Sequence, residues 1–167
     1  MGYSVTHRIE TDVDTLWQLF FDERVVRAML EQLGNPADYK IVEQRVDDQG
    51  LQHRTIECWS KVQLPSLITK VFGDGSYTEY GCYDSVAKKY TARCVPKQNG
   101  DKVGTKFEIT ASPIGDGSHC ERKVTVENTV NVFGLGSVIS SLLERGQRAS
   151  HDQSAKFLNE WLRSQRG

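Results

Sequence analysis

The sequence has no marked excess of either charge and no long apolar run. Its 21 lysines and arginines nearly balance 22 aspartates and glutamates, which gives a formal net charge of −1. Proteins that bind nucleic acid by neutralising phosphates normally carry a basic excess, so nucleic acid is not an expected partner. No window approaches the ~18 consecutive apolar residues of a membrane-spanning helix. We therefore expect at most peripheral contact with a membrane.

The residue patterns of common metal, redox and hydrolase sites are also missing. Cys58, Cys82, Cys94 and Cys120 form no CxxC pair, and the four histidines show no HExxH or similar spacing. Neither a GxSxG motif nor a P-loop occurs. We therefore expect no metal and no cofactor, and we assign no catalytic residue. Because the amino terminus shows no secretory signal and the cysteines suggest reduced thiols, the sequence predicts a cytoplasmic protein.

The chain contains the ordinary ingredients of a globular domain, with 38% hydrophobic and 26% charged residues. Its length predicts one domain over residues 1–167. Helical spacing of apolar residues predicts a short helix after Thr11, a second helix at Glu23–Leu33 and a long helix at Leu135–Ser164. We expect Thr11 to be the N-cap of the first helix. Alternating apolar and polar residues predict seven strands, at Tyr3–Ile9, Tyr39–Val46, Leu51–Ser60, Ser76–Tyr83, Lys89–Val95, Val103–Ala111 and Cys120–Val132.

The order of these elements predicts an α+β fold. The alternation in the strands is typical of an antiparallel sheet with one face in water. At 1.5 Å per residue, the last helix would be on the order of 45 Å long, enough to cross a seven-stranded sheet about 29 Å wide. The helices are therefore expected to pack together on one side of the sheet.

The middle of the long helix suggests a cavity. Apolar residues mark both ends of its expected sheet-facing side, whereas small or polar residues stand between them. Small residues at mid-helix leave space that a ligand can fill, although neighbouring aromatic side chains can also fill it. The cavity-lining residues expected from this helix are Leu142, Gly146, Ala149 and Gln153.

The strands supply the other expected cavity-lining residues, although inward apolar side chains are also ordinary core. Strand alternation points these side chains inward: Ile56, Tyr77, Tyr90, Phe107, Ile109, Val124 and Val126. His7 and Asn128 share the parity of their apolar neighbours, so their side chains should also point inward. There they either orient a ligand or find all their hydrogen-bond partners within the core. Arg54 and Arg122 have the same parity, but we expect them at the ends of the sheet, in water.

An apolar segment from Leu64 to Phe72 interrupts the strand pattern. Its apolar residues are Leu64, Leu67, Ile68, Val71 and Phe72. We interpret it as a short amphipathic helix at the cavity mouth, with a flexible hinge at Gly134 and Gly136. The same helix can instead pack flat on the sheet rim or touch a membrane surface.

The layout resembles that of a known superfamily. The first strand and the following segment Ile9–Phe20 resemble the entry of START-like, birch-pollen-allergen-type proteins, the SRPBCC group. Leu64-Pro65, Lys70–Gly73 and Phe157–Trp161 are similar to a bacterial START-like family of unknown function. The resemblance implies a helix-grip fold, in which a curved seven-stranded antiparallel sheet wraps around a long C-terminal helix, with two short helices after the first strand and an apolar cavity.

The resemblance also implies a function. We expect the chain to bind, and in that way to transfer or sequester, a hydrophobic ligand such as a lipid or sterol. One alternative is a cofactor-free enzyme similar to polyketide cyclases and dehydratases, with His7 or cavity tyrosines as acid and base. Another is a START-like domain that binds a protein partner.

Overall fold

A computed structural model describes residues 2–34, 36, 38–60 and 64–167 of the chain. In chain order the elements are β1 (Gly2–Ile9), α1 (Val13–Phe21), α2 (Glu23–Leu33), β2 (Asp38–Val46), β3 (Gln52–Trp59), α3 (Ser66–Phe72), β4 (Tyr77–Asp84), β5 (Lys89–Pro96), β6 (Val103–Ile114), β7 (His119–Val130) and α4 (Gly136–Arg166).

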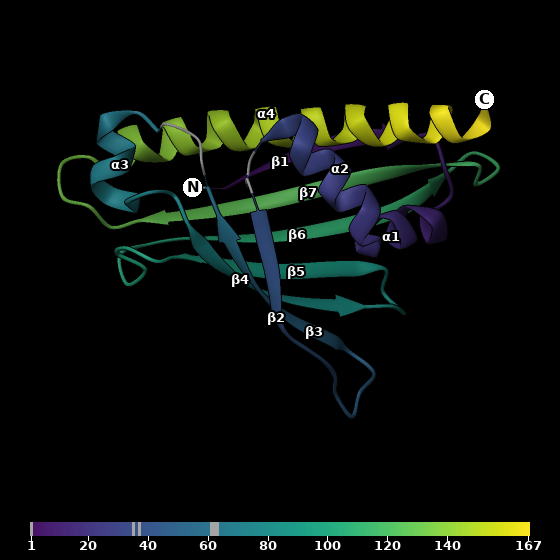
Figure 1. Cartoon of the computed structure of the whole chain (residues 1–167), viewed down its shortest axis with the longest axis horizontal. Helices are drawn as coiled ribbons and strands as arrows, with labels where there is room; N and C mark the ends of the chain where they lie inside the picture. Colours follow the sequence, from purple (N-terminus) through teal and green to yellow (C-terminus); the bar gives the residue numbers. More distant parts are fainter. Residues whose placement is uncertain (1, 35, 37, 61–63) are drawn as a thin grey trace.

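The strands form one antiparallel sheet in the order β1-β7-β6-β5-β4-β3-β2 (Figure 1). Each strand pairs with its neighbour in sequence, except that β1 pairs with the last strand. Alternate residues of β7 are buried from Cys120 to Asn128, and the residues between them are exposed. One face of the sheet is therefore the inner face. The α+β fold with a seven-stranded antiparallel sheet, predicted from the sequence, is confirmed.

Local side-chain contacts fix the two short helices. The sequence predicts Thr11 as the first N-cap, but Asp12 takes that role, because its carboxylate accepts from the Thr15 amide at 2.9 Å. Asp22 caps α2 in the same way, so the two helices follow each other directly. Gly34 ends α2 with a left-handed φ of 71°, a conformation that costs glycine little.

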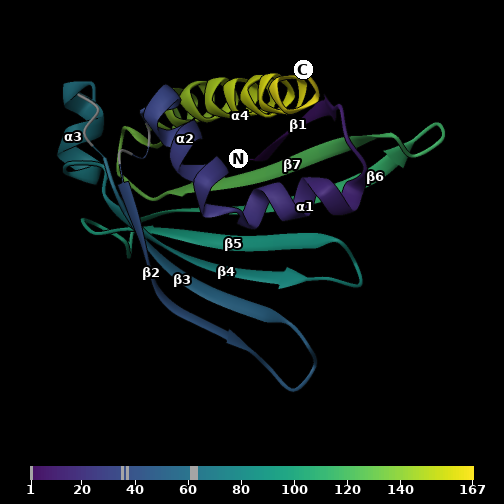
Figure 2. The same ribbon diagram turned by 45° about the vertical axis from the view of Figure 1, so that its right-hand side comes forward.

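Helices α1, α2 and α4 lie on the inner side of the sheet, whereas α3 lies at one end of it (Figures 1 and 2). α4 runs along β1 and β7 and contacts α2, while α1 contacts β6 and α2. The length of α4 would allow it to cross the whole sheet, but it follows only one edge. The inner face of the other strands is therefore left to α1 and α2. Among the described residues, no helix is long and apolar enough to span a membrane.

The side of α4 that faces the sheet differs from the side that hydrophobic spacing predicts. The inward residues in its middle include Gln147, whose amide bonds to Asn128 in both directions, at 2.8 and 3.0 Å. These polar contacts set the rotation of the helix, and an apolar pattern cannot show them. Four predicted cavity residues are exposed instead, which corrects their placement: Leu142, Gly146, Ala149 and Gln153.

Candidate functional site

An interior cavity of about 250 Å³ lies between the inner face of the sheet and helices α1, α2 and α4. Its wall is mainly apolar, with aromatic side chains from α1 (Trp17, Phe20) and from the strands (Tyr39, Tyr77). Four acidic or basic side chains interrupt this wall deep in the fold, namely Arg54, Glu79, Arg122 and His151, while Glu23 lines the cavity from the exposed start of α2. An apolar space with a few placed polar groups is the usual form of a small-molecule site.

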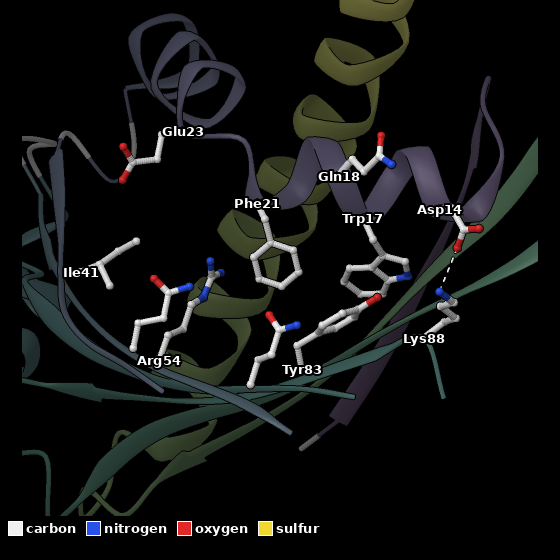
Figure 3. Close-up of a pocket in the computed structure, with 11 residues that line it drawn as sticks. Asp14, Trp17, Gln18, Phe21, Glu23, Ile41, Arg54, Tyr83 and Lys88 are labelled. Carbon is white, nitrogen blue, oxygen red and sulfur yellow. Dashed lines mark ion pairs between the residues drawn. The ribbon is translucent and has the colours of Figure 1, made fainter. Parts of the chain in front are cut away.

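A second, more open space of about 680 Å³ lies beside the cavity, between α1 and strands β2–β4. Figure 3 shows Phe21 and Arg54 meeting at its centre, with Trp17 and Tyr83 next to them and the Asp14–Lys88 ion pair at one side. The lining residues that this groove shares with the cavity are Trp17, Phe21, Glu23, Ile41 and Arg54. The shared residues make this groove the natural approach to the cavity.

A buried group of Arg54, Tyr90 and Glu79 forms the first polar region of the site. The Arg54 Nε donates to the Tyr90 hydroxyl at 2.9 Å, and that hydroxyl donates to Glu79 Oε1 at 2.5 Å. Arg54 Nη2 lies 3.9 Å from the same oxygen, and both charged side chains are only 13–14% exposed. Burial raises the pKa of the Glu79 carboxyl, while Tyr90 and Arg54 oppose that rise. Glu79 therefore has the environment of a carboxyl group that can take up and return a proton.

The position of Tyr90 depends on a glycine in the neighbouring strand. A Cβ atom at Gly81 would lie 1.8 Å from the Tyr90 hydroxyl oxygen, and Tyr90 is fully buried. We expect Gly81→Ala to lower the free energy of unfolding by about 1–3 kcal/mol, because the ring has no space to retreat. Urea unfolding measures this loss. Gly146→Ala is the matched control: it meets open space on α4 and should stabilise by ~1 kcal/mol. Equal effects of the two substitutions would contradict the packing described here.

The second polar region centres on Arg122, which is 7% exposed. Its Nη2 donates to His7 Nδ1 at 3.2 Å, to the His151 carbonyl at 2.9 Å and to Ser154 Oγ at 3.1 Å. Burial lowers the pKa of Arg122 to about 10, so it is still charged at neutral pH. Burial, followed by the charge of Arg122, lowers the pKa of His151 to about 4, so His151 is neutral there.

The hydrogen bonds also define the tautomer of His7. A guanidinium group only donates, so His7 Nδ1 must accept from Arg122 and carries no proton. His7 Nε2 then carries the proton and donates to Asp152 Oδ1 at 2.7 Å. Asp152 is 68% exposed. The nearest acid to Arg122 is thus held at the surface, on the far side of a neutral imidazole.

The structure brings some of the predicted site residues together and separates others. Ile56, Tyr77, Ile109 and Val124 line the cavity. Tyr90, Phe107 and Val126 belong to the packed core beneath α1, His7 contacts Arg122, and Asn128 bonds to Gln147 and Thr105. Arg54 and Arg122 correct the expectation of solvent-exposed sheet ends, because both are buried and both line the cavity.

The expected cavity mouth is in a different place. α3 forms a separate apolar cluster with Val103 of β6 and Ile139 of α4. Among its predicted mouth residues, Leu64, Leu67, Ile68, Val71 and Phe72, none lines the cavity or the adjoining groove. The open approach lies instead at α1 and β2–β4, where Phe21 and Arg54 meet. α3 therefore packs on the rim of the sheet.

Sequence reasoning missed the acidic member of the site and all of the cavity-lining residues from α1 and α2. Glu79 has the parity of Tyr77, so alternation alone would place its side chain inward, but acidic residues are almost never fully buried unless they are paired. Of the four cysteines, all are free, and Cys58 lines the cavity. Burial raises its pKa to about 12, so it is not a thiolate nucleophile at neutral pH. Within the described parts of the chain, no group of three metal-ligating side chains occurs.

Comparison with a protein-family model gives a match over residues 4–162, to a family described as "Protein of unknown function (DUF2505)". The chain belongs to this family. No curated protein sequence matches it.

Solved structures show the same fold in proteins of low sequence identity. The Zhui aromatase/cyclase from Streptomyces sp. R1128 aligns with a TM-score of 0.66 and 12% identity, over 97% of this chain and 95% of that one. Norcoclaurine synthase from Thalictrum flavum, in complex with dopamine and hydroxybenzaldehyde, gives 0.61 and 16% identity, over 96% and 88%. A START superfamily protein from Mycobacterium smegmatis gives 0.60 and 13%, over 98% and 97%. This DUF2505 chain therefore has the START/SRPBCC helix-grip fold.

Proposed function

We propose that this DUF2505 chain is a ligand-binding domain that encloses a hydrophobic small molecule in the cavity between its sheet and its helices. The proposal rests on the apolar wall of that cavity, which includes the aromatic side chains of Trp17, Phe20, Tyr39 and Tyr77. The fold supports it, because helix-grip proteins commonly bind ligands. Binding would be driven by burial of apolar surface, worth about 0.8 kcal/mol for each methylene group removed from water.

The size of the cavity favours a compact aromatic ligand. Its volume of about 250 Å³ lies just below the roughly 300–1,000 Å³ typical of drug-sized ligands. A lipid or sterol would have to occupy the adjoining groove of about 680 Å³ as well. The norcoclaurine synthase complex holds two small aromatic molecules in the same fold, which supports the compact class.

Native mass spectrometry of the full chain, purified from its own host, tests this proposal. We expect a bound molecule that remains attached under native conditions and is released on denaturation, and its mass gives the ligand class. Protein that is purified empty and takes up neither 2-naphthamide nor a long-chain fatty acid would contradict the proposal.

An enzyme of the cyclase or dehydratase type is the second candidate, and one observation favours it. Glu79 lines the cavity, has a raised pKa and bonds to the Tyr90 hydroxyl at 2.5 Å. A carboxyl group with a pKa nearer neutrality is suited to general acid–base catalysis. This pair replaces His7, which bonds to Arg122 and Asp152, as the acid–base candidate.

A protein-interaction role would use a different part of the surface. Four exposed apolar residues lie before and along the first turns of α4, namely Phe133, Leu135, Val138 and Leu142. Apolar residues grouped on a surface are typical of protein contacts. The presence of the interior cavity favours ligand binding over this role, because a domain used only for docking has no need of one.

A further inference from the structure

The buried charges around the cavity do not balance, and the imbalance is at Arg122. Glu23, the other acidic residue in the cavity wall, is exposed at the start of α2. Arg54 has a buried counter-charge in Glu79, reached at 3.9 Å and through the Tyr90 hydroxyl. Arg122 forms no ion pair with any carboxylate of the described residues, and its Nη2 bonds only to neutral acceptors. One end of the cavity therefore has a neutralised cation, and the other has a cation without a partner of opposite charge.

The groups around Arg122 cannot supply the missing negative charge. His7 accepts through an unprotonated Nδ1, and its other nitrogen bonds to Asp152, which is mostly in water. His151, with a pKa lowered to about 4, is neutral at physiological pH. A guanidinium group that is buried without a counter-charge is strongly disfavoured. A negatively charged ligand group would supply that counter-charge.

Two donors in the wall of the same cavity lack acceptors. Arg122 Nε and Trp17 Nε1 are both buried, and neither has a hydrogen-bond partner within the described residues. Both residues line the cavity. Buried donors are nearly always paired, so those that are not require an explanation. Both are donor-only groups, which calls for a ligand rich in acceptors rather than one that donates.

We propose that the ligand carries a carboxylate that pairs with Arg122, while its apolar body lies against the aromatic wall of the cavity. This inference rests on the proposed function. A carboxylate matches the planar guanidinium group, and it adds little bulk in a space of about 250 Å³. Arg54 is already paired with Glu79, so no unpaired cation remains for a second acidic group, and a monocarboxylate fits better than a dicarboxylate.

A pair of probes that differ only in charge tests the inference on the full chain. 2-Naphthoate and 2-naphthamide share the same ring system, and isothermal titration calorimetry at pH 7 gives both affinities. We expect the naphthoate to bind about tenfold more tightly or better, the size of a charge-assisted hydrogen bond. Arg122→Met should abolish this preference. Arg8→Met removes the same charge from the exposed outer face of β1 and should leave the preference intact.

The outcomes separate this inference from the proposed function. Equal affinity for the two probes in the native protein overturns the inference, while binding of the neutral amide upholds the proposed function. A preference for naphthoate that survives Arg122→Met overturns the assignment to Arg122. Binding of neither probe overturns the inference, and it overturns the proposed function as well if the protein is also purified empty and takes up no long-chain fatty acid. Circular dichroism monitors folding, and Arg122→Lys, which retains the charge, should retain part of the preference if Arg122→Met fails to fold.

Discussion

Replacing Val26 with tryptophan should strongly weaken the binding of 2-naphthamide and leave a folded protein. Val26 is half-buried on α2 and lines the cavity. The tryptophan ring, much larger than the valine side chain, would project into a space of only about 250 Å³. Making room for a ligand would then require side chains to move, at a cost of about 1–3 kcal/mol, which corresponds to a loss of affinity of roughly 5- to 150-fold. Calorimetric titration of the variant measures this loss.

Ala149→Trp is the matched control for this experiment. It introduces the same side chain on α4, but on the exposed side of that helix. We expect affinity for 2-naphthamide to remain unchanged. The opposite result, in which Ala149→Trp blocks binding and Val26→Trp does not, would place the cavity beneath the side of α4 that its apolar pattern predicts, and would contradict the location described here.

The fold was predictable because its signals are local. Alternation in the strands, the Asp47–Gly50 turn and the glycine that ends α2 each depend on neighbouring residues. α2 begins and ends at the predicted residues, Glu23 and Leu33. The N-cap of α1 is Asp12 and not the predicted Thr11, which moves the start of the helix by one residue and leaves the topology unchanged.

The polar part of the site was less predictable because its contacts join residues far apart in sequence. Arg54 bonds to Tyr90, 36 positions away, and Arg122 bonds to Ser154, 32 positions away. Strand parity pointed both arginines inward, but an arginine is seldom buried unless it is paired. The partners, which decide between the interior and water, are not visible in a hydrophobic pattern.

The same limit explains the error in the rotation of α4. An apolar pattern assigns the small residues Gly146 and Ala149 to the sheet-facing side, since nothing in it distinguishes a small inward residue from a small exposed one. Gln147 determines the outcome, because its amide bonds to Asn128 and accepts from the Tyr3 hydroxyl at 3.1 Å. A polar residue thus occupies the middle of the helix–sheet contact where a ligand was expected.

Arg54→Met should destabilise the fold more than Arg122→Met, the other charge deletion proposed at this site. It leaves the carboxylate of Glu79 buried without a cation, and breaking a buried pair in this way costs about 3 kcal/mol or more. The loss should depend on pH. Without Arg54, nothing but Tyr90 opposes the rise that burial causes in the pKa of Glu79, so as the pH falls the folded variant takes up this proton before the unfolded chain does. Stability of the variant therefore rises as the pH falls, and its deficit relative to the native protein narrows.

Urea unfolding at pH 7 and pH 5 measures both parts of this prediction. The double variant Arg54→Met/Glu79→Leu should recover most of the lost stability, because it removes the unpaired charge. Arg163→Met, which breaks the exposed pair with Glu10, should have a much smaller effect with no such recovery. A double variant as unstable as Arg54→Met alone would show that Arg54 acts through its stacking on Phe20 and Phe21, at 5.0 Å from each ring, rather than by compensating the charge of Glu79.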